Sequence, residues 1–184
     1  GELPVLNLPT DFDRPLKQSF EGDRVDFAVD KELYEKLSTA ATEIEGTLFM
    51  VLIAAYNVLL YKYTGQEDII VGSPIAGRPH WDLKNIVGMF VNMLSIRSFP
   101  SGEKTFKDFL MEVRESSLAA FENQDYQFEE LVEKLKIERD SARSPIFDVI
   151  FALQNMDFPN IQTNDLEFKS LEQEFNTSKF DVSL

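Results

Sequence analysis

Hydrophobic residues recur at helical spacing in four stretches of the chain. The spacing predicts helices over residues 31–44, 47–64, 105–123 and 128–135. Residues that favour helix ends stand where these stretches begin or stop, namely Asp30, Thr47, Thr105 and Gly65. Residues 48–56 are apolar without interruption, which is about half of the roughly 20 residues that a membrane span needs. We therefore expect the second helix to be buried between layers.

Short runs rich in Val, Ile and Phe predict strands around these helices. The runs are residues 25–29, 68–73, 90–99, 147–153, about 166–171 and 179–184. The first alternates like a half-buried strand, whereas the second and fourth are continuously apolar, as in strands covered on both faces. Pro74 is expected to end the second run, and prolines before residue 16 leave residues 1–23 as an extended lead-in. The elements predict an α/β layered domain, a mixed sheet with helices packed on it.

Composition narrows the possible classes of function. The 184 residues carry 18 Lys and Arg against 32 Asp and Glu, a net charge of −14, and no basic run stands out, so a nucleic-acid phosphate binder is not expected. The absence of cysteine excludes disulfides, thiolate nucleophiles and Cys-ligated metals, and it fits a cytoplasmic protein. A single histidine excludes a multi-His metal site.

Familiar catalytic motifs are missing from the sequence. There is no G-x-S-x-G, no phosphate-binding P-loop and no dinucleotide G-x-G-x-x-G. The one histidine, His80, lies beside Trp81 in a predicted loop, where it is either a general acid–base or a surface or packing residue. Residue types and spacing alone thus predict a fold class, no metal site and no activity.

Three segments carry more information. In the first, residues 87–97, Asn92 interrupts an apolar strand, so its amide either pairs with the backbone of a neighbouring loop or lines a polar channel. In the second, residues 123–129, Asp125 is expected to cap the short helix that begins near Phe128. In the third, residues 139–148, two arginines either bind an anion or partner or form an Arg–Asp network that holds a loop at the strand entrance.

In this order, the three segments resemble the later core motifs of the condensation domain of non-ribosomal peptide synthetases. The family patterns are V-G-x-F-V-N-T-x-x-x-R, H-Q-D-x-P-F-E and R-D-x-S-R-N-P-L. The matching structural positions here are Gly88, Phe90, Phe128, Arg139, Asp140, Arg143 and Pro145. LNLPTDFDRP near the start and SKFDVSL at the end also resemble family segments, so the resemblance covers essentially the whole chain.

A few positions depart from the family patterns. Met93 replaces Thr, Asn123 replaces His and Gln127 replaces Pro. In the third motif, Ala142 and Ser144 replace Ser and Asn. The Phe90-Val-Asn92 sequence favours a condensation domain over the related epimerization domains, whose motif differs.

The resemblance implies one lobe of a chloramphenicol-acetyltransferase-like fold, in which two lobes form a V around a tunnel. Residues 1–23 would be the lead-in from the lobe junction, and residues 24–184 the C-terminal lobe, truncated at its C-terminus. The family's catalytic H-H-x-x-x-D-G motif belongs to the N-terminal lobe and is absent here. The chain is therefore expected to supply no catalytic residue, to be inactive alone and to expose an unusually large apolar face.

The reaction implied for the parent is amide formation between a donor acyl or peptidyl thioester and an acceptor aminoacyl thioester. Both are carried on phosphopantetheine arms, and the lobe would supply a tunnel wall and a carrier docking surface. The implied partners are the N-terminal lobe, two carrier domains and an adenylation domain, without nucleic acid or membrane. Candidate tunnel residues are Asn92, Arg97, Gln124 and Asp125. The alternatives are a non-catalytic condensation-like module that recruits a partner protein, or an epimerization domain.

Overall fold

A four-stranded mixed sheet organises the molecule in a computed structural model, which describes residues 2–138, 140–154 and 176–184. The elements are α1 (Lys31–Glu43), α2 (Leu48–Thr64), β1 (Ile69–Ile75), the 3-10 turn η1 (Trp81–Leu83), β2 (Asn92–Ser98), α3 (Phe106–Glu122), α4 (Phe128–Leu135), β3 (Val149–Ile150) and β4 (Val182–Ser183). The strand order is β2-β1-β3-β4; β1 and β2 are antiparallel, and the other two pairings are parallel. The predicted mixed sheet with packed helices is confirmed.

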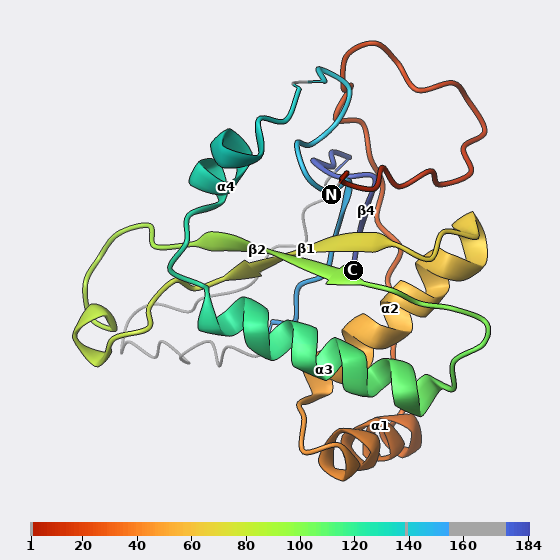
Figure 1. Cartoon of the computed structure of the whole chain (residues 1–184), viewed down its shortest axis with the longest axis vertical. Helices are drawn as coiled ribbons and strands as arrows, with labels where there is room; N and C mark the ends of the chain where they lie inside the picture. The colour runs from red at the N-terminus through yellow and green to blue at the C-terminus, as the bar shows by residue number, and fades with distance from the viewer. Residues whose placement is uncertain (1, 139, 155–175) are drawn as a thin grey trace, which may run out of the picture.

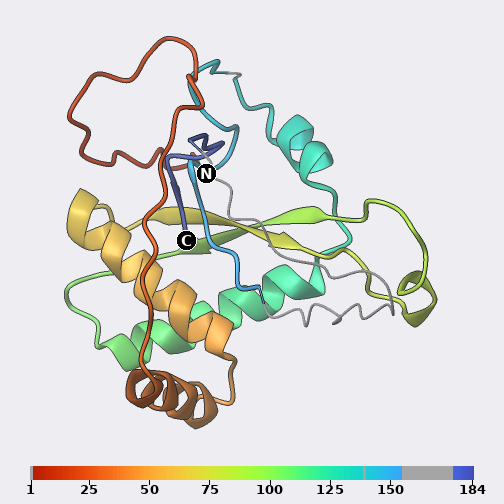
Figure 2. The same cartoon turned by 180° about the vertical axis from the view of Figure 1, so that it is seen from behind.

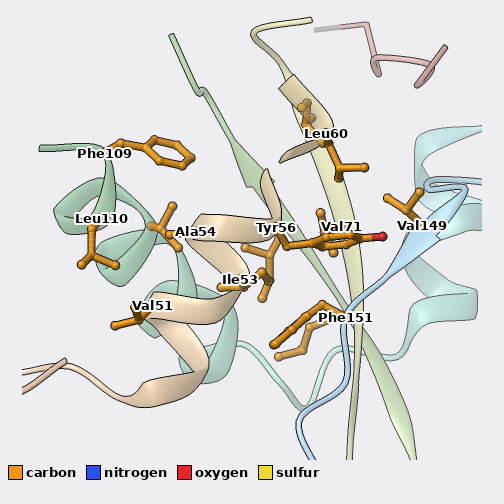
Figure 3. Close-up of a cluster of buried hydrophobic side chains, with 14 of the residues drawn as sticks. Val51, Ile53, Ala54, Tyr56, Leu60, Val71, Phe109, Leu110, Val149 and Phe151 are labelled. Atoms are coloured by element: carbon orange, nitrogen blue, oxygen red, sulfur yellow. The ribbon is translucent and has the colours of Figure 1, made fainter. Parts of the chain in front are cut away.

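The two faces of the sheet are covered by different helices. Helices α2 and α3 lie against one face with α1 beyond them, and α4 stands apart on the other side (Figures 1 and 2). The larger hydrophobic cluster fills the first face and includes Ile53, Val71 and Phe151 (Figure 3). A smaller one around Ile70 and Phe147 receives the apolar side of α4. Because β1 is covered on both faces, its continuous apolar sequence follows from its position.

Helix ends follow the local sequence signals. Asp30 Oδ1 accepts a hydrogen bond from the Leu33 N–H, and Thr47 and Thr105 cap α2 and α3 in the same way. Gly65 ends α2 with φ of +68°, the left-handed conformation that glycine adopts without strain. One prediction is only partly right: α2 is buried along one side, but Tyr63 is 66% exposed. Among the described residues, no single helix meets the length and hydropathy criteria for a membrane span; α1 and α2 meet them only jointly, across a 104° bend.

The strand predictions need more correction than the helices. Residues 25–29 form no strand, and Val25 and Phe27 are 86% and 73% exposed, because no described strand pairs with them. Pro74 does not end β1: it is paired with Met93, and β3 pairs with β1 only at Gly72, so a missing N–H at Pro74 costs the ladder little. The predicted strand over residues 147–153 shortens to β3. The one near residues 166–171 lies outside the described residues.

Candidate functional site

Asn92, at the start of β2, is the most fully engaged polar side chain of the candidate site. Its Nδ2 donates to the carbonyl oxygens of Gln124 and Tyr126, both at 2.9 Å. Its Oδ1 accepts from the Met93 and Phe128 N–H groups at 2.9 and 3.1 Å. Asn92 is only 4% exposed, so its amide loses its hydrogen bonds to water on folding. These four bonds replace them. Of the two interpretations of Asn92, the structure has the one in which it pairs with the backbone of a neighbouring loop.

The prediction that Asp125 caps α4 is wrong. The N-cap position is Gln127, which makes no side-chain capping bond, and the side chain of Asp125 is exposed. The Phe128 N–H is satisfied instead by Asn92, which lies 36 residues earlier in the chain. Capping rules search only the residues next to a helix start, so they could not find a cap supplied by a strand. The sequence feature that pointed to this contact was an asparagine within an otherwise apolar strand.

Phe128, one of the motif positions, anchors the start of α4. Its ring lies 5.4 Å from that of Phe147, centroid to centroid, in the smaller hydrophobic cluster. Together with the Asn92 bonds, this contact fixes both ends of the loop formed by residues 123–127, hereafter the α3–α4 loop. The backbones of Gln124 and Tyr126 are thereby held against the start of β2.

Arg97 lies at the other end of β2 and does not join this group. It lies five positions after Asn92, which is about 17 Å along a strand and places the two side chains on opposite faces. Its Nε and Nη2 donate to the two carboxylate oxygens of Asp68 at 2.8 and 2.6 Å. This hydrogen bonding raises the pKa of the Arg97 guanidinium. The four predicted tunnel residues therefore do not form one cluster: the structure brings Asn92 to the loop that carries Gln124 and Asp125, and leaves Arg97 apart.

Arg78, which no sequence pattern singled out, organises the loop between β1 and β2. Its guanidinium donates to the carbonyl oxygens of Leu83, Ile86 and Gly88, and lies 4.2 Å from the centroid of the Phe90 ring. Gly88 and Phe90, singled out as motif positions, are thus contacts of one arginine. Hydrogen bonds from one arginine to three backbone carbonyls do not alter the spacing of hydrophobic residues. The hydrophobic pattern therefore could not reveal the role of Arg78.

The same loop carries the single histidine and several exposed apolar side chains. His80 Nδ1 accepts from the Asp82 N–H at 3.3 Å, and 73% of its side chain is exposed, which matches the surface interpretation. At the far end of the loop, Val87 and Met89 are 100% and 92% exposed. The loop organised by Arg78 therefore presents an apolar tip to solvent.

The segment of residues 140–148 contains an Arg–Asp network. Arg143 Nη1 donates to the carboxylate of Asp148 and, at 3.2 Å, to the carbonyl of Leu6. Burial raises the pKa of Asp148, although Arg143 acts in the opposite direction. Asp140 accepts from the Ala142 N–H at 2.8 Å, which shapes the turn. The network interpretation is confirmed for Arg143; Arg139 lies outside the described residues, and Pro145 is exposed.

A cavity in the described part of the chain lies apart from the candidate site. This cavity, of about 250 Å³, lies between residues 3–6, the start of β1 and residues 143–148, away from Asn92. Within the described ranges, no group of three or more Asp, Glu or His side chains is arranged to hold a metal ion. The geometry at Asn92 positions the α3–α4 loop.

Comparisons with known proteins agree on one family. A family model described as "Condensation domain" matches residues 1–184. Gramicidin S synthase 2 of Brevibacillus brevis is 55% identical over 185 residues, and bacitracin synthase 3 of Bacillus licheniformis 51% over 184; each match covers 100% of this chain. The chain spans only 4% and 3% of these two relatives.

A solved structure shares the fold. The holo form of AB3403, a four-domain non-ribosomal peptide synthetase bound to AMP and glycine, aligns with a TM-score of 0.80 and 27% identity. The match covers 83% of this chain and 12% of that one. The family and the architecture inferred from the sequence are therefore confirmed together.

Proposed function

This chain belongs to the condensation-domain family of the non-ribosomal peptide synthetases, and we propose that it forms the C-terminal lobe of a domain that makes amide bonds. The acceptor amine attacks the donor acyl or peptidyl thioester, the new C–N bond replaces the C–S bond, and the donor carrier leaves as a thiol. The amine loses one proton in this step, and the thiolate gains one. Both substrates arrive on phosphopantetheine arms of carrier domains, loaded by an adenylation domain.

The lobe contributes positioning, since a thioester is already activated. Holding two reactants in reacting geometry can supply about 7–11 kcal/mol of the barrier. Proton transfer needs a group that titrates near neutrality, and we assign it to the N-terminal lobe, because the one histidine of this chain is a surface residue. The lobe then acts as one wall of the substrate tunnel, and by itself it has no condensation activity.

The observation that carries this proposal is the α3–α4 loop fixed by Asn92. Two carbonyls of the loop and the first N–H of α4 all bond to this one side chain. We propose Asn92 as a positioning residue, with Gln124 and Asp125 on the loop facing the tunnel. Arg97 is set apart from this wall, because it lies on the opposite face of β2.

The test uses the full synthetase module that contains this chain, with donor and acceptor carriers loaded and the amide product measured by mass spectrometry. We expect N92A to lower the rate of amide formation at least tenfold while carrier loading stays at the wild-type level. Q127A, at the uncapped N-cap of the same helix, is the control and should retain the wild-type rate. The 184-residue chain alone should give no product.

Two results would contradict the proposal. Amide formation by the 184-residue chain alone would mean that it needs no second lobe. A wild-type module that binds loaded carriers but never consumes the donor thioester would favour the non-catalytic recruiting module.

A further inference from the structure

Residues 9–22 follow an open path in which the described part of the chain forms no helix and no sheet ladder. The segment arches away from the sheet in both views (Figures 1 and 2), and among the described residues its only strand-like pairing is an isolated bridge between Glu21 and Thr177. Phe12 and Leu16 are 87% and 91% exposed, so apolar burial does not hold the outer part of the arc. Polar contacts with distant parts of the chain must therefore determine its position.

Ion pairs provide the first set of these contacts. Both Nη atoms of Arg14 donate to the carboxylate of Asp181, and Nη1 also reaches the Ala142 carbonyl at 3.1 Å. The Asp181 N–H donates to the Asp148 carbonyl at 2.8 Å, and Arg143 bonds both Asp148 and the Leu6 carbonyl. The side chains of Arg14 and Asp181 are only 26% and 22% exposed, so water screens this pair less than a fully exposed one.

Neutral hydrogen bonds form a second set beside the first. The Gln18 N–H donates to the Ser141 carbonyl at 3.1 Å, and Ser141 Oγ donates back to the Leu16 carbonyl at 2.6 Å. Gln18 Nε2 also donates to the Lys179 carbonyl at 2.7 Å. Each contact joins residues more than 120 positions apart, so the arc is fastened to two segments, residues 141–148 and residues 176–181.

The C-terminal segment to which the arc is bonded, which includes β4, is itself weakly held. Strand β4 has two residues, and within the described ranges it pairs only with β3, which is equally short. Segments with few ladder bonds and little apolar burial open at lower free energy than the core. By contrast, α2 and β1 contribute many of the fully buried side chains.

We propose that residues 9–22 are a releasable strap, fastened through Arg14 and Asp181, that opens together with β4 while the helical core stays folded. Release of the strap removes the Arg14 bond from the Ala142 carbonyl and the Leu16 and Gln18 bonds from Ser141, so the short segment of residues 141–142 loses its contacts with the strap. The position of the chain before residue 22 is thereby coupled to that segment. This inference concerns the fold of the 184 residues and does not depend on the proposed reaction.

Limited proteolysis of the whole chain by chymotrypsin, with Phe12 as the reporter site, tests the strap. A protease draws an extended stretch of backbone into its active site, so cleavage reports opening of the arc. We expect R14M and D181N each to raise the cleavage rate at Phe12 by about five- to tenfold, and the double variant to add little, because both remove the same pair. The matched control is R24M: Arg24 pairs with Asp26, and both side chains are more than two-thirds exposed. It should leave the rate unchanged.

Hydrogen exchange distinguishes coupling from local loosening. R14M should also speed exchange of the amides of residues 181–184, on the other partner segment, without affecting α2. The charge-reversed pair R14D with D181R should restore protection. If R14M unfolds the whole chain, R14K, which keeps the charge but loses the two-pronged geometry, gives the same readouts. Equal cleavage in R14M and R24M, or faster cleavage with unchanged exchange at residues 181–184, would overturn the strap.

Discussion

At the scale of single residues, Asn92 concentrates several structural tasks in one amide. Replacing it with alanine leaves the Phe128 N–H and the Gln124 and Tyr126 carbonyls without their partner. We expect N92A to lower the free energy of unfolding by about 3 kcal/mol, since each buried group left unsatisfied costs about 1–3 kcal/mol. Urea denaturation of the 184-residue chain measures this change.

Q127A is again the matched control for Asn92. Gln127 holds the N-cap position of α4 but makes no capping bond, so its removal should cost less than about 0.5 kcal/mol. Equal losses in Q127A and N92A would mean that α4 is capped locally and that Asn92 is dispensable.

Asp148 is a single residue that makes the stability of the fold depend on pH. Its pKa is raised above the ordinary 3.8, first by burial and also by Asp181, against the opposing effect of Arg143 and Arg14. The folded state therefore keeps the proton to higher pH than the unfolded chain does. The stabilising contribution of protonated Asp148 is fully present below pH 3.8, and it is lost as the pH rises through the pKa of Asp148 in the folded state.

The D148N variant removes this titration. The unfolding free energy of the wild type relative to D148N should fall as the pH rises through that window, measured by urea denaturation at several pH values. A relative gain by the wild type would show that attraction to Arg143 outweighs burial.

At the scale of elements, helices were predictable and strands much less so. The ends of α2 are set by Thr47 and Gly65, which act on the nearest backbone groups, so the local sequence contains the information. A strand depends on a partner that lies far away in the sequence. Residues 25–29 alternate as a strand would, yet no described segment pairs with them, and the pattern alone could not reveal this.

The loop between β1 and β2 depends on Gly77 for its shape. At φ of +61°, an added Cβ would lie 1.7 Å from the Phe90 carbonyl oxygen. Gly65 has a similar φ of +68° but nothing within 4 Å of its Cβ position. Replacing Gly65 with alanine therefore measures the cost of the backbone conformation without a steric clash. We expect G65A to cost about 1 kcal/mol and G77A at least twice that.

Urea denaturation of both variants separates the clash from the strain. An equal cost in G77A and G65A would mean that the loop moves aside without loss, and that Arg78 does not hold it in one conformation.

At the scale of the whole molecule, the ordered motifs carried the prediction further than any single pattern. Periodicity predicted a layered domain with helices on a mixed sheet, and the family resemblance identified this domain as part of a chloramphenicol-acetyltransferase-like fold. Neither could separate Arg97 from Asn92, because the two belong to the same motif and lie apart only through strand geometry. Contacts between distant segments, such as Arg14 with Asp181, were equally invisible in the linear sequence.

The exposed tip of the β1–β2 loop yields a prediction for the whole assembly. Val87 and Met89 are almost fully exposed, so the double variant V87S/M89S should change the unfolding free energy of the 184-residue chain by less than about 0.5 kcal/mol. If a second lobe covers this tip in the complete domain, the same variant should slow amide formation by the full module at least tenfold. L16S is the control, because Leu16 is 91% exposed on the strap. Equal effects of the two variants on the module would show that general loss of apolar surface, and not a lobe contact at the tip, limits the reaction.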